Sequence, residues 1–241
     1  MIGSAQWLAS AAGVALSGSA GVLAYAVRYP SATLLAPSVH EGAKTRPAIA
    51  LTFDDGPSES TPELLEILAA HRASATFFQC GANVRRLPEI ARAVAEAGHE
   101  IGNHSDTHPK LHFKSPNFIY TELARAQETI WHATGRRPRY FRAPFGLRWF
   151  GLGEAQQRLD LMGVMWTTLA MDWKWPSERI IQRLTRGASN GAIFCLHDGR
   201  QLETKPDIRV TLESVRELLP KLMEQGFHFE KVSDILCPTN N

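Results

Sequence analysis

Two histidines, His104 and His108, stand four positions apart in the segment Asn103-His-Ser-Asp-Thr-His-Pro109. In a helical turn, side chains with this spacing lie on the same side, so both imidazole rings can reach one metal ion. Imidazole together with carboxylate is a ligand set that suits zinc or a similar divalent cation. Taken alone, the pair also fits a surface pair or a helix cap, so carboxylates nearby are needed to indicate a metal site.

Two adjacent carboxylates, Asp54 and Asp55, follow the apolar run 48–53 and begin the sequence Asp-Asp-Gly-Pro. Acids at the end of a buried strand are costly unless they bind something. In an extended segment their side chains point opposite ways, so one can bind a metal while the other faces a substrate. All four residues also favour turns, which is the alternative interpretation. Two histidines and one carboxylate leave positions open for water and substrate, as catalytic zinc requires.

Three further positions fit hydrolytic chemistry. Arg142 can pair with the second carboxylate and keep it ionised, so that it can take a proton from water. The turn Pro144-Phe145-Gly146 can present a backbone N–H to a developing oxyanion. His197 follows the apolar run 193–196, which predicts that it lies at a pocket floor and protonates a leaving amine. The alternatives are a surface ion pair for Arg142 and a satisfied core histidine for His197.

The elements that must position these residues alternate between short strands and helices. We expect strands over 48–53, 75–80, 100–102, 139–141, 164–169, 192–196 and 227–232, and helices over 62–71, 88–97, 115–134, 154–162 and 209–225. The alternation predicts an α/β fold with a parallel sheet. About seven such units favour a compact (β/α) barrel of one domain, with a doubly wound open sheet as the alternative. Every polar cluster follows a predicted strand, so the clusters should meet on the barrel face where active sites lie.

The N-terminal part of the chain has a different composition. Residues 7–27 include no charged side chain, and about 21 such residues suffice to cross the hydrocarbon core of a bilayer. We therefore expect residues 1–28 to be a hydrophobic segment that acts as a membrane anchor or export signal, with a small-residue helix on the surface as the alternative. Residues 29–46 predict a linker, and residues 47–236 a single catalytic domain. The protein is then anchored in the membrane or exported to the cell envelope, although a cytoplasmic location stays open.

The overall composition excludes some classes of protein. The net charge is +2 and no dense stripe of Lys and Arg is present, so the sequence does not indicate binding to nucleic acid. The chain has three cysteines, an odd number without metal-ligand spacing. Cys80 and Cys195 lie in apolar runs and read as small buried hydrophobic residues.

The ordered motifs resemble those of the polysaccharide deacetylases, also called NodB homology domains or carbohydrate esterase family four. The resemblance spans about residues 47–235, and its motifs are Thr52-Phe-Asp-Asp-Gly-Pro57, His104-Ser-Asp-Thr-His108, Arg142-Ala-Pro-Phe-Gly146 and Leu196-His197. It implies a distorted (β/α)7–8 barrel and a hydrolase that removes N-acyl groups from amino sugars. The implied substrates are peptidoglycan, chitin-like oligomers or lipid-linked sugars.

The resemblance also implies a role for each residue. Asp54 is then the general base, Arg142 orients it, and Asp55, His104 and His108 hold a divalent metal, expected to be Zn²⁺ with Co²⁺ as an alternative. His197 is the general acid. Phe145 stands where the family often has Tyr, and its backbone N–H would serve the oxyanion. The other residues expected at the substrate are Pro144, Gly146, Trp173 and Leu196.

One motif departs from the family pattern. Many members carry an Asp four residues before the tryptophan, where it supports the acid histidine, but this chain has Leu169 at that place before Trp173. Asp172, directly before the tryptophan, is not expected to substitute for it. We therefore expect weaker activity or a shifted substrate. The alternatives are an impaired carbohydrate-binding envelope protein and a hydrolase of a non-sugar amide.

Overall fold

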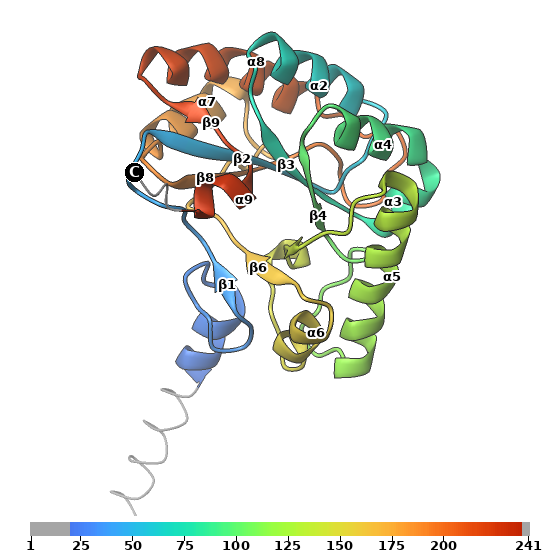
Figure 1. The fold of residues 1–241 in the computed structure, drawn as a ribbon. Helices are drawn as coiled ribbons and strands as arrows, with labels where there is room; N and C mark the ends of the chain where they lie inside the picture. Colours follow the sequence, from blue (N-terminus) through green and yellow to red (C-terminus); the bar gives the residue numbers. More distant parts are fainter. Residues whose placement is uncertain (1–19, 238–241) are drawn as a thin grey trace, which may run out of the picture.

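A parallel sheet forms the centre of the molecule (Figure 1), whose computed structural model describes residues 20–237. Its strands are β1 (Ser38–Val39), β2 (Ala48–Asp54), β3 (Ala75–Gln79), β4 (Glu100–Asn103), β5 (Tyr140–Phe141), β6 (Met162–Val164), β7 (Thr168–Leu169), β8 (Ala192–His197) and β9 (His228–Phe229). In the described residues the strand order is β1-β6-β5-β4-β3-β2-β8-β7, and β9 pairs with β2. All of these pairs are parallel, which confirms the predicted distorted (β/α) barrel.

Helices cover the outer face of the sheet (Figure 1). They are α2 (Thr61–Ala70), α3 (Gly81–Arg86), α4 (Pro88–Glu96), α5 (Pro116–Thr134), α6 (Leu152–Arg158), α7 (Ser177–Arg186) and α8 (Arg209–Glu224). A further helix, α9 (Val232–Leu236), packs against the inner face of the sheet, and a short 3₁₀ turn covers Pro144–Gly146. The limits of α5 follow from its sequence, since Ser115 Oγ accepts from Phe118 N at 3.2 Å and Gly135 ends the helix with φ 69°.

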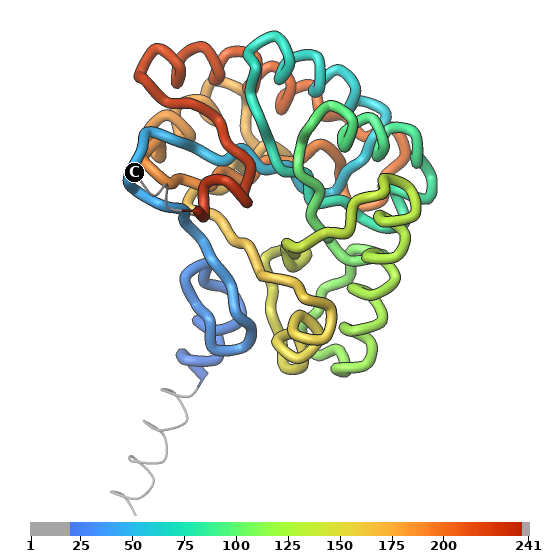
Figure 2. The backbone as a smooth tube through the Cα atoms, viewed as in Figure 1, coloured from blue at the N-terminus to red at the C-terminus, as the bar shows by residue number. Residues whose placement is uncertain are grey.

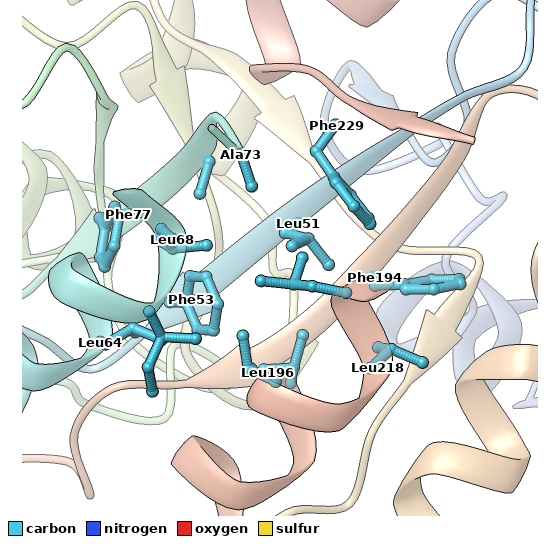
Figure 3. Packing of buried hydrophobic residues seen from close by; sticks show 14 of the residues in the cluster. Leu51, Phe53, Leu64, Leu68, Ala73, Phe77, Phe194, Leu196, Leu218 and Phe229 are labelled. Carbon is cyan, nitrogen blue, oxygen red and sulfur yellow. The ribbon is translucent and has the colours of Figure 1, made fainter. Parts of the chain in front are cut away.

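Strand β2 shows how side-chain alternation separates the core from the site. Leu51 and Phe53 point outward into the main hydrophobic cluster beneath α2 and α8 (Figure 3). Thr52 and Asp54 point inward, where both contact Arg142. The interior of the barrel also contains a separate apolar cluster, which includes side chains of α9. The sheet therefore has an apolar outer face and an interior that becomes polar at the carboxyl ends of the strands.

The strand expected over 164–169 is interrupted, and its course explains how the sheet curves. Residues 165–167 leave β6 and cross to the opposite edge of the sheet, where β7 pairs with β8. Met165 N donates to Val39 O at 2.7 Å, and Thr167 N donates to Ile193 O at 2.9 Å. This crossing segment lies between the two edge regions, so one predicted strand becomes two short ones.

Other expectations need smaller corrections. The predicted last strand, 227–232, is short and gives way to α9, and α3 and α7 were not expected from the sequence. The segment 29–46, interpreted as a linker, supplies β1, which pairs with β6. Its attachment depends on Arg148, a buried side chain whose Nη1 donates to Ala32 O at 2.6 Å. The folded unit therefore begins before residue 47.

The predicted N-terminal hydrophobic segment lies largely outside the described residues. Its described part, residues 20–28, is a helix, drawn in blue below β1 (Figures 1 and 2). Among residues 20–237, none of the helices combines the length and apolar character needed to cross a bilayer.

Candidate active site

The carboxyl ends of the strands bring the polar motifs together. Asp54 pairs in register with His197 across β2 and β8, and Arg142 directly follows β5. Asp55, His104 and His108 come from the loops after β2 and β4, and each is buried. Six residues from four separate segments of the sequence therefore lie on one rim of the barrel, as the sequence predicts.

The Asp55 carboxylate and two imidazoles form a group that can hold one cation. Asp55 Oδ1 lies 3.4 Å from His104 Nε2 and 3.0 Å from His108 Nε2. The ligand atoms of the three residues all lie within 4.8 Å of one another. Asp55 Oδ2 is occupied by the N–H of Gln201 at 2.8 Å, which leaves Oδ1 free of any conventional hydrogen bond in the described residues. A buried oxygen and two imidazole nitrogens that converge in this way fit a divalent cation such as zinc.

Hydrogen bonds around the group fix the direction of the His104 ring. His104 Nδ1 lies 2.8 Å from the carbonyl oxygen of Arg142, so it donates there and leaves Nε2 as the lone-pair nitrogen toward Asp55. Burial alone would raise the pKa of Asp55, but its contacts with His104 and His108 outweigh burial and hold this pKa well below its usual range. The carboxylate is therefore ionised, as a metal ligand must be.

The expected helical turn between the histidines is absent. Residues 104–108 form a loop in which Ser105 and His108 have φ of 65° and 54°, and Asp55 has φ of 73°. The ring centroids still lie 4.9 Å apart. Non-glycine residues rarely adopt such conformations, and clusters of them are typical of functional sites. The prediction that both rings share one side is confirmed, but its helical reason is wrong.

Arg142 holds Asp54 in one orientation. Its Nη1 donates to Asp54 Oδ1 at 2.7 Å and to Thr52 Oγ1 at 2.6 Å. The other guanidinium nitrogens donate to carbonyl oxygens of Val164 and Met165 at 3.1 Å and 3.0 Å. The side chain is fully buried, so this ion pair is not weakened by solvent. The other carboxylate oxygen of Asp54, Oδ2, lies 3.9 Å from His104 Nε2, beside the group Asp55, His104 and His108.

His197 has a carboxylate partner, contrary to the expectation from Leu169. Asp172 Oδ1 lies 2.8 Å from His197 Nδ1, while Asp172 Oδ2 accepts from the backbone N–H of His197 at 2.9 Å. Thr211 Oγ1 also donates to Asp172, at 2.7 Å. Burial lowers the pKa of His197, but the charge of Asp172 and its hydrogen bond outweigh burial and raise this pKa to about 9. Asp172 is thus the carboxylate partner of His197, which the sequence alone did not predict.

The residues expected at the substrate divide into two groups. Phe145 and Trp173 are exposed on the rim, with ring centroids 4.7 Å from His108 and 4.9 Å from His197. Pro144 and Gly146 are buried supports of the turn, and a Cβ on Gly146 would lie 2.6 Å from Trp166. Leu196 is not at the site, because it faces outward and packs with Phe53 and Leu64 in the main core (Figure 3).

The turn at Phe145 exposes a backbone donor. Phe145 has φ 59°, and the turn uses the N–H groups of Gly146 and Leu147, which donate to Ala143 O and Pro144 O at 2.8 Å and 3.1 Å. Within residues 20–237, the Phe145 N–H donates to no other protein group. It therefore has no protein acceptor there, and its expected bond to an oxygen atom of a bound molecule stays a prediction.

Sequence reasoning missed one neighbour of Asp54. The Sγ of Cys195 lies 3.4 Å from Asp54 Oδ2, and Cys195, Asp54 and His197 form a second group with metal-ligand spacing. Burial raises the pKa of the Cys195 thiol well above its usual range, so it stays protonated and is a poor ligand. Alternation along β8 was a signal that could have found it, since Cys195 and His197 must share a face.

This arrangement is that of a hydrolase whose barrel rim carries an ion-paired carboxylate, an ion-paired histidine and a group that can hold a cation. The polysaccharide deacetylase family profile matches residues 41–163. A chitooligosaccharide deacetylase of Azorhizobium caulinodans is 36% identical over 189 residues, covering 75% of this chain and 90% of that protein. The chain belongs to the polysaccharide deacetylase family.

Other similar proteins extend the comparison. Peptidoglycan-N-acetylglucosamine deacetylase PgdA of Listeria monocytogenes is 33% identical over 210 residues, which cover 86% of this chain but 42% of that longer protein. A family 4 carbohydrate esterase from Streptomyces lividans has a TM-score of 0.70 at 29% identity, covering 78% of this chain and 93% of that one. A family pseudoenzyme from Bacillus anthracis has a TM-score of 0.75 at 29% identity, covering 84% of this chain and 69% of that one.

Proposed function

We propose that the protein is a metal-dependent hydrolase that removes N-acetyl or N-acyl groups from amino sugars of a polysaccharide or glycolipid. The observation that carries this proposal is the placement of Asp54 and His197 side by side on the neighbouring strands β2 and β8, next to the group Asp55, His104 and His108. The names of the relatives support an amino-sugar substrate, since they describe deacetylases of peptidoglycan and chitooligosaccharide.

The proposed reaction is hydrolysis of an amide by water. Asp54 takes a proton from the water as its oxygen bonds to the acyl carbon, and Arg142 keeps the Asp54 carboxylate aligned through its hydrogen bond to Oδ1. The Phe145 N–H donates to the carbonyl oxygen as that oxygen gains charge. His197 then gives its proton to the amine nitrogen as the carbon–nitrogen bond breaks, which yields a carboxylate and a free amino sugar.

Asp55, His104 and His108 are the residues that would hold the metal, with zinc the expected ion and cobalt an alternative. A divalent cation there would polarise the acyl carbonyl and lower the pKa of water bound to it. The exposed rings of Phe145 and Trp173 lie next to His108 and His197. We propose that they contact the faces of the sugar units around the acylated one.

Replacing Asp172 with asparagine tests the proposed acid. Loss of the carboxylate charge removes the interaction that favours the protonated form of His197, so its pKa falls from about 9. We expect kcat to fall about 10²-fold or more, and the alkaline limb of kcat/KM to move to lower pH. The measurement is the pH profile of acetate release for both proteins. An alkaline limb that stays in place would show that His197 is not the acid.

Replacing Leu169 with aspartate introduces the carboxylate that many family members have at this position. The variant tests whether Asp172 already supplies that carboxylate to His197. Because Asp172 already bonds His197 Nδ1 at 2.8 Å, we expect no gain in kcat/KM from a second carboxylate. The measurement compares initial rates of the variant and the parent on the same oligomer at equal zinc occupancy. A large increase in rate would mean that Asp172 does not support the acid in the active protein.

Release of acetate from N-acetylglucosamine oligomers is the experiment that tests the function. The full chain is assayed after loading with zinc and after removal of metal by a chelator, with simple N-alkyl acetamides as competing substrates. Release that requires metal and prefers the oligomers supports the proposal. Release from the simple amides alone would indicate a hydrolase of non-sugar amides, and binding of oligomers without release an impaired binding protein.

We also propose that the protein is attached to a membrane through its N-terminal segment and acts in the cell envelope. The support is compositional, since Arg28 is the first charged side chain of the sequence. Flotation of the full chain with lipid vesicles after removal of detergent tests this attachment, and a chain that stays at the bottom of the gradient would contradict it.

A further inference from the structure

The N-terminal helix and the domain loops beside it carry exposed apolar side chains. From the N-terminal part they are Val22, Leu23, Tyr25, Tyr29 and Leu34, and from the domain they are Phe113 and Phe150. Leu34 is 71% exposed, Phe113 78% and Phe150 55%. Single exposed apolar residues are ordinary, but a group that spans two parts of the chain indicates a surface with a partner.

Ring contacts occur within each of the two parts of this group, and a backbone hydrogen bond joins the two parts. Phe113 lies 4.6 Å from Trp149, and Trp149 lies 5.2 Å from Phe150, measured between ring centroids. Tyr25 and Tyr29 lie 5.1 Å apart in the same measure. The loop that carries Trp149 and Phe150 is bonded to the N-terminal helix, because Arg148 N donates to Val27 O at 3.1 Å.

The side chain of Arg148 fixes the helix to the domain. Its Nη1 donates to Ala32 O at 2.6 Å, and its Nη2 donates to Tyr29 O. These carbonyls follow the carboxyl end of the helix, where a cation is favoured. The guanidinium is almost fully buried, and no carboxylate within residues 20–237 pairs with it. The helix and the domain surface therefore keep one relative orientation.

The charged side chains within the segments that carry this surface have one sign, and the nearby Glu154 faces Arg158 of its own helix at 3.8 Å. The segments 20–37, 109–118 and 147–151, which carry the surface, contain no Asp or Glu. They contain Arg28, Lys110, Lys114 and Arg148. Aromatic side chains next to apolar ones, with lysine and arginine nearby, are the composition of a protein surface at the boundary between lipid tails and anionic headgroups.

We propose that this surface, made of helix 20–28, Leu34, Phe113 and Phe150, binds the interfacial region of a lipid bilayer. The occupant follows from the chain itself, since residues 1–19 carry no charged side chain and lead directly into the exposed apolar helix. The inference extends the proposed attachment from the N-terminal segment to the catalytic domain. Because Phe113 lies in the same loop as His108, the domain sits with a loop of its active site beside the membrane, where a glycan or lipid-linked sugar near the bilayer can reach it.

Site-directed fluorescence in vesicles tests the proposal. Phe113→Cys and Phe150→Cys are made in the full chain with Cys237→Ser, because Cys80 and Cys195 are buried. A small fluorophore is attached, and the chain is reconstituted in phosphatidylethanolamine–phosphatidylglycerol vesicles with or without nitroxide-labelled lipid. Met223→Cys is the matched control, since Met223 is an exposed apolar residue on α8, at the far end of the molecule from helix 20–28 (Figure 1).

We expect the labels at positions 113 and 150 to lose most of their emission to the nitroxide lipid, while the label at 223 keeps its emission. Phe113→Glu with Phe150→Glu, labelled at Leu34→Cys, should lower this quenching without changing turnover of soluble oligomers. Labels at 113 and 150 that match the label at 223 in chains that float with vesicles would overturn the proposal but leave the attachment standing. Energy transfer between copies labelled at 113, without lipid quenching, would identify a second copy as the occupant and also overturn it.

Discussion

Asp54→Asn is expected to reduce kcat for acetate release by about 10²- to 10⁴-fold, the usual contribution of a positioned general base. Asparagine keeps the shape of the side chain and can still accept from Arg142, but it cannot take a proton from water. Because Asp55, His104 and His108 are unchanged, the variant should still bind zinc. The measurements are acetate release at saturating oligomer and zinc content of the purified protein.

The loss of a buried charge partner will also lower the stability of this variant, since Arg142 is fully buried. Glu230→Gln is a matched control, because Glu230 forms an ion pair with Arg46 that lies outside the site. The distance between Arg46 Nη2 and Glu230 Oε2 is 2.6 Å. It should lower the melting temperature but keep activity. An Asp54→Asn protein that is folded, contains zinc and keeps full activity would show that another group is the base.

Asp55→Ala and His108→Ala are expected to abolish stable zinc binding and activity together. Removing one of three protein ligands should weaken zinc by more than the 10- to 100-fold typical of losing a hydrogen-bond partner of a ligand. Equilibrium dialysis against zinc measures this directly. Zinc should also raise the melting temperature of the parent protein but not of these variants, because a ligand stabilises only a folded state that binds it.

A nearby histidine provides the control for these ligand variants. His112 lies in the same loop but outside the group of ligand atoms, so His112→Ala should keep zinc binding and activity. Retained zinc affinity in both ligand variants would contradict the assignment of the site, whereas retained affinity with lost activity would assign these residues to another role.

Much of this site could be predicted from types and order of residues. The parallel arrangement forces every loop after a strand onto one rim, so Asp54, His104, Arg142 and His197 had to meet if the strands were correct. The prediction for Leu196 failed because it followed the motif and not the alternation of β8, which turns Leu196 outward and Cys195 inward.

Other features depend on contacts that no local pattern shows. Asp172 reaches His197 because residues 170–173 turn back after β7, with φ of 64° at Met171, and a count of positions from Trp173 does not reveal this. The segment 29–46 has little periodicity, yet β1 joins the sheet because Arg148, distant in sequence, binds its carbonyls. The predicted strand 164–169 divides into β6 and β7 because the chain crosses there from one edge region of the sheet to the other. The position of that crossing depends on the order of all the strands.

The crossing segment has a consequence for how this enzyme can change over evolution. Arg142 donates to the carbonyl oxygens of Val164 and Met165, where the chain leaves β6, and the same guanidinium aligns Asp54. Closure of the barrel and alignment of the carboxylate therefore share one side chain. We therefore expect a substitution of Arg142 to lower stability and activity together, so that variants with new substrates would arise more readily in the loops that carry Phe145 and Trp173.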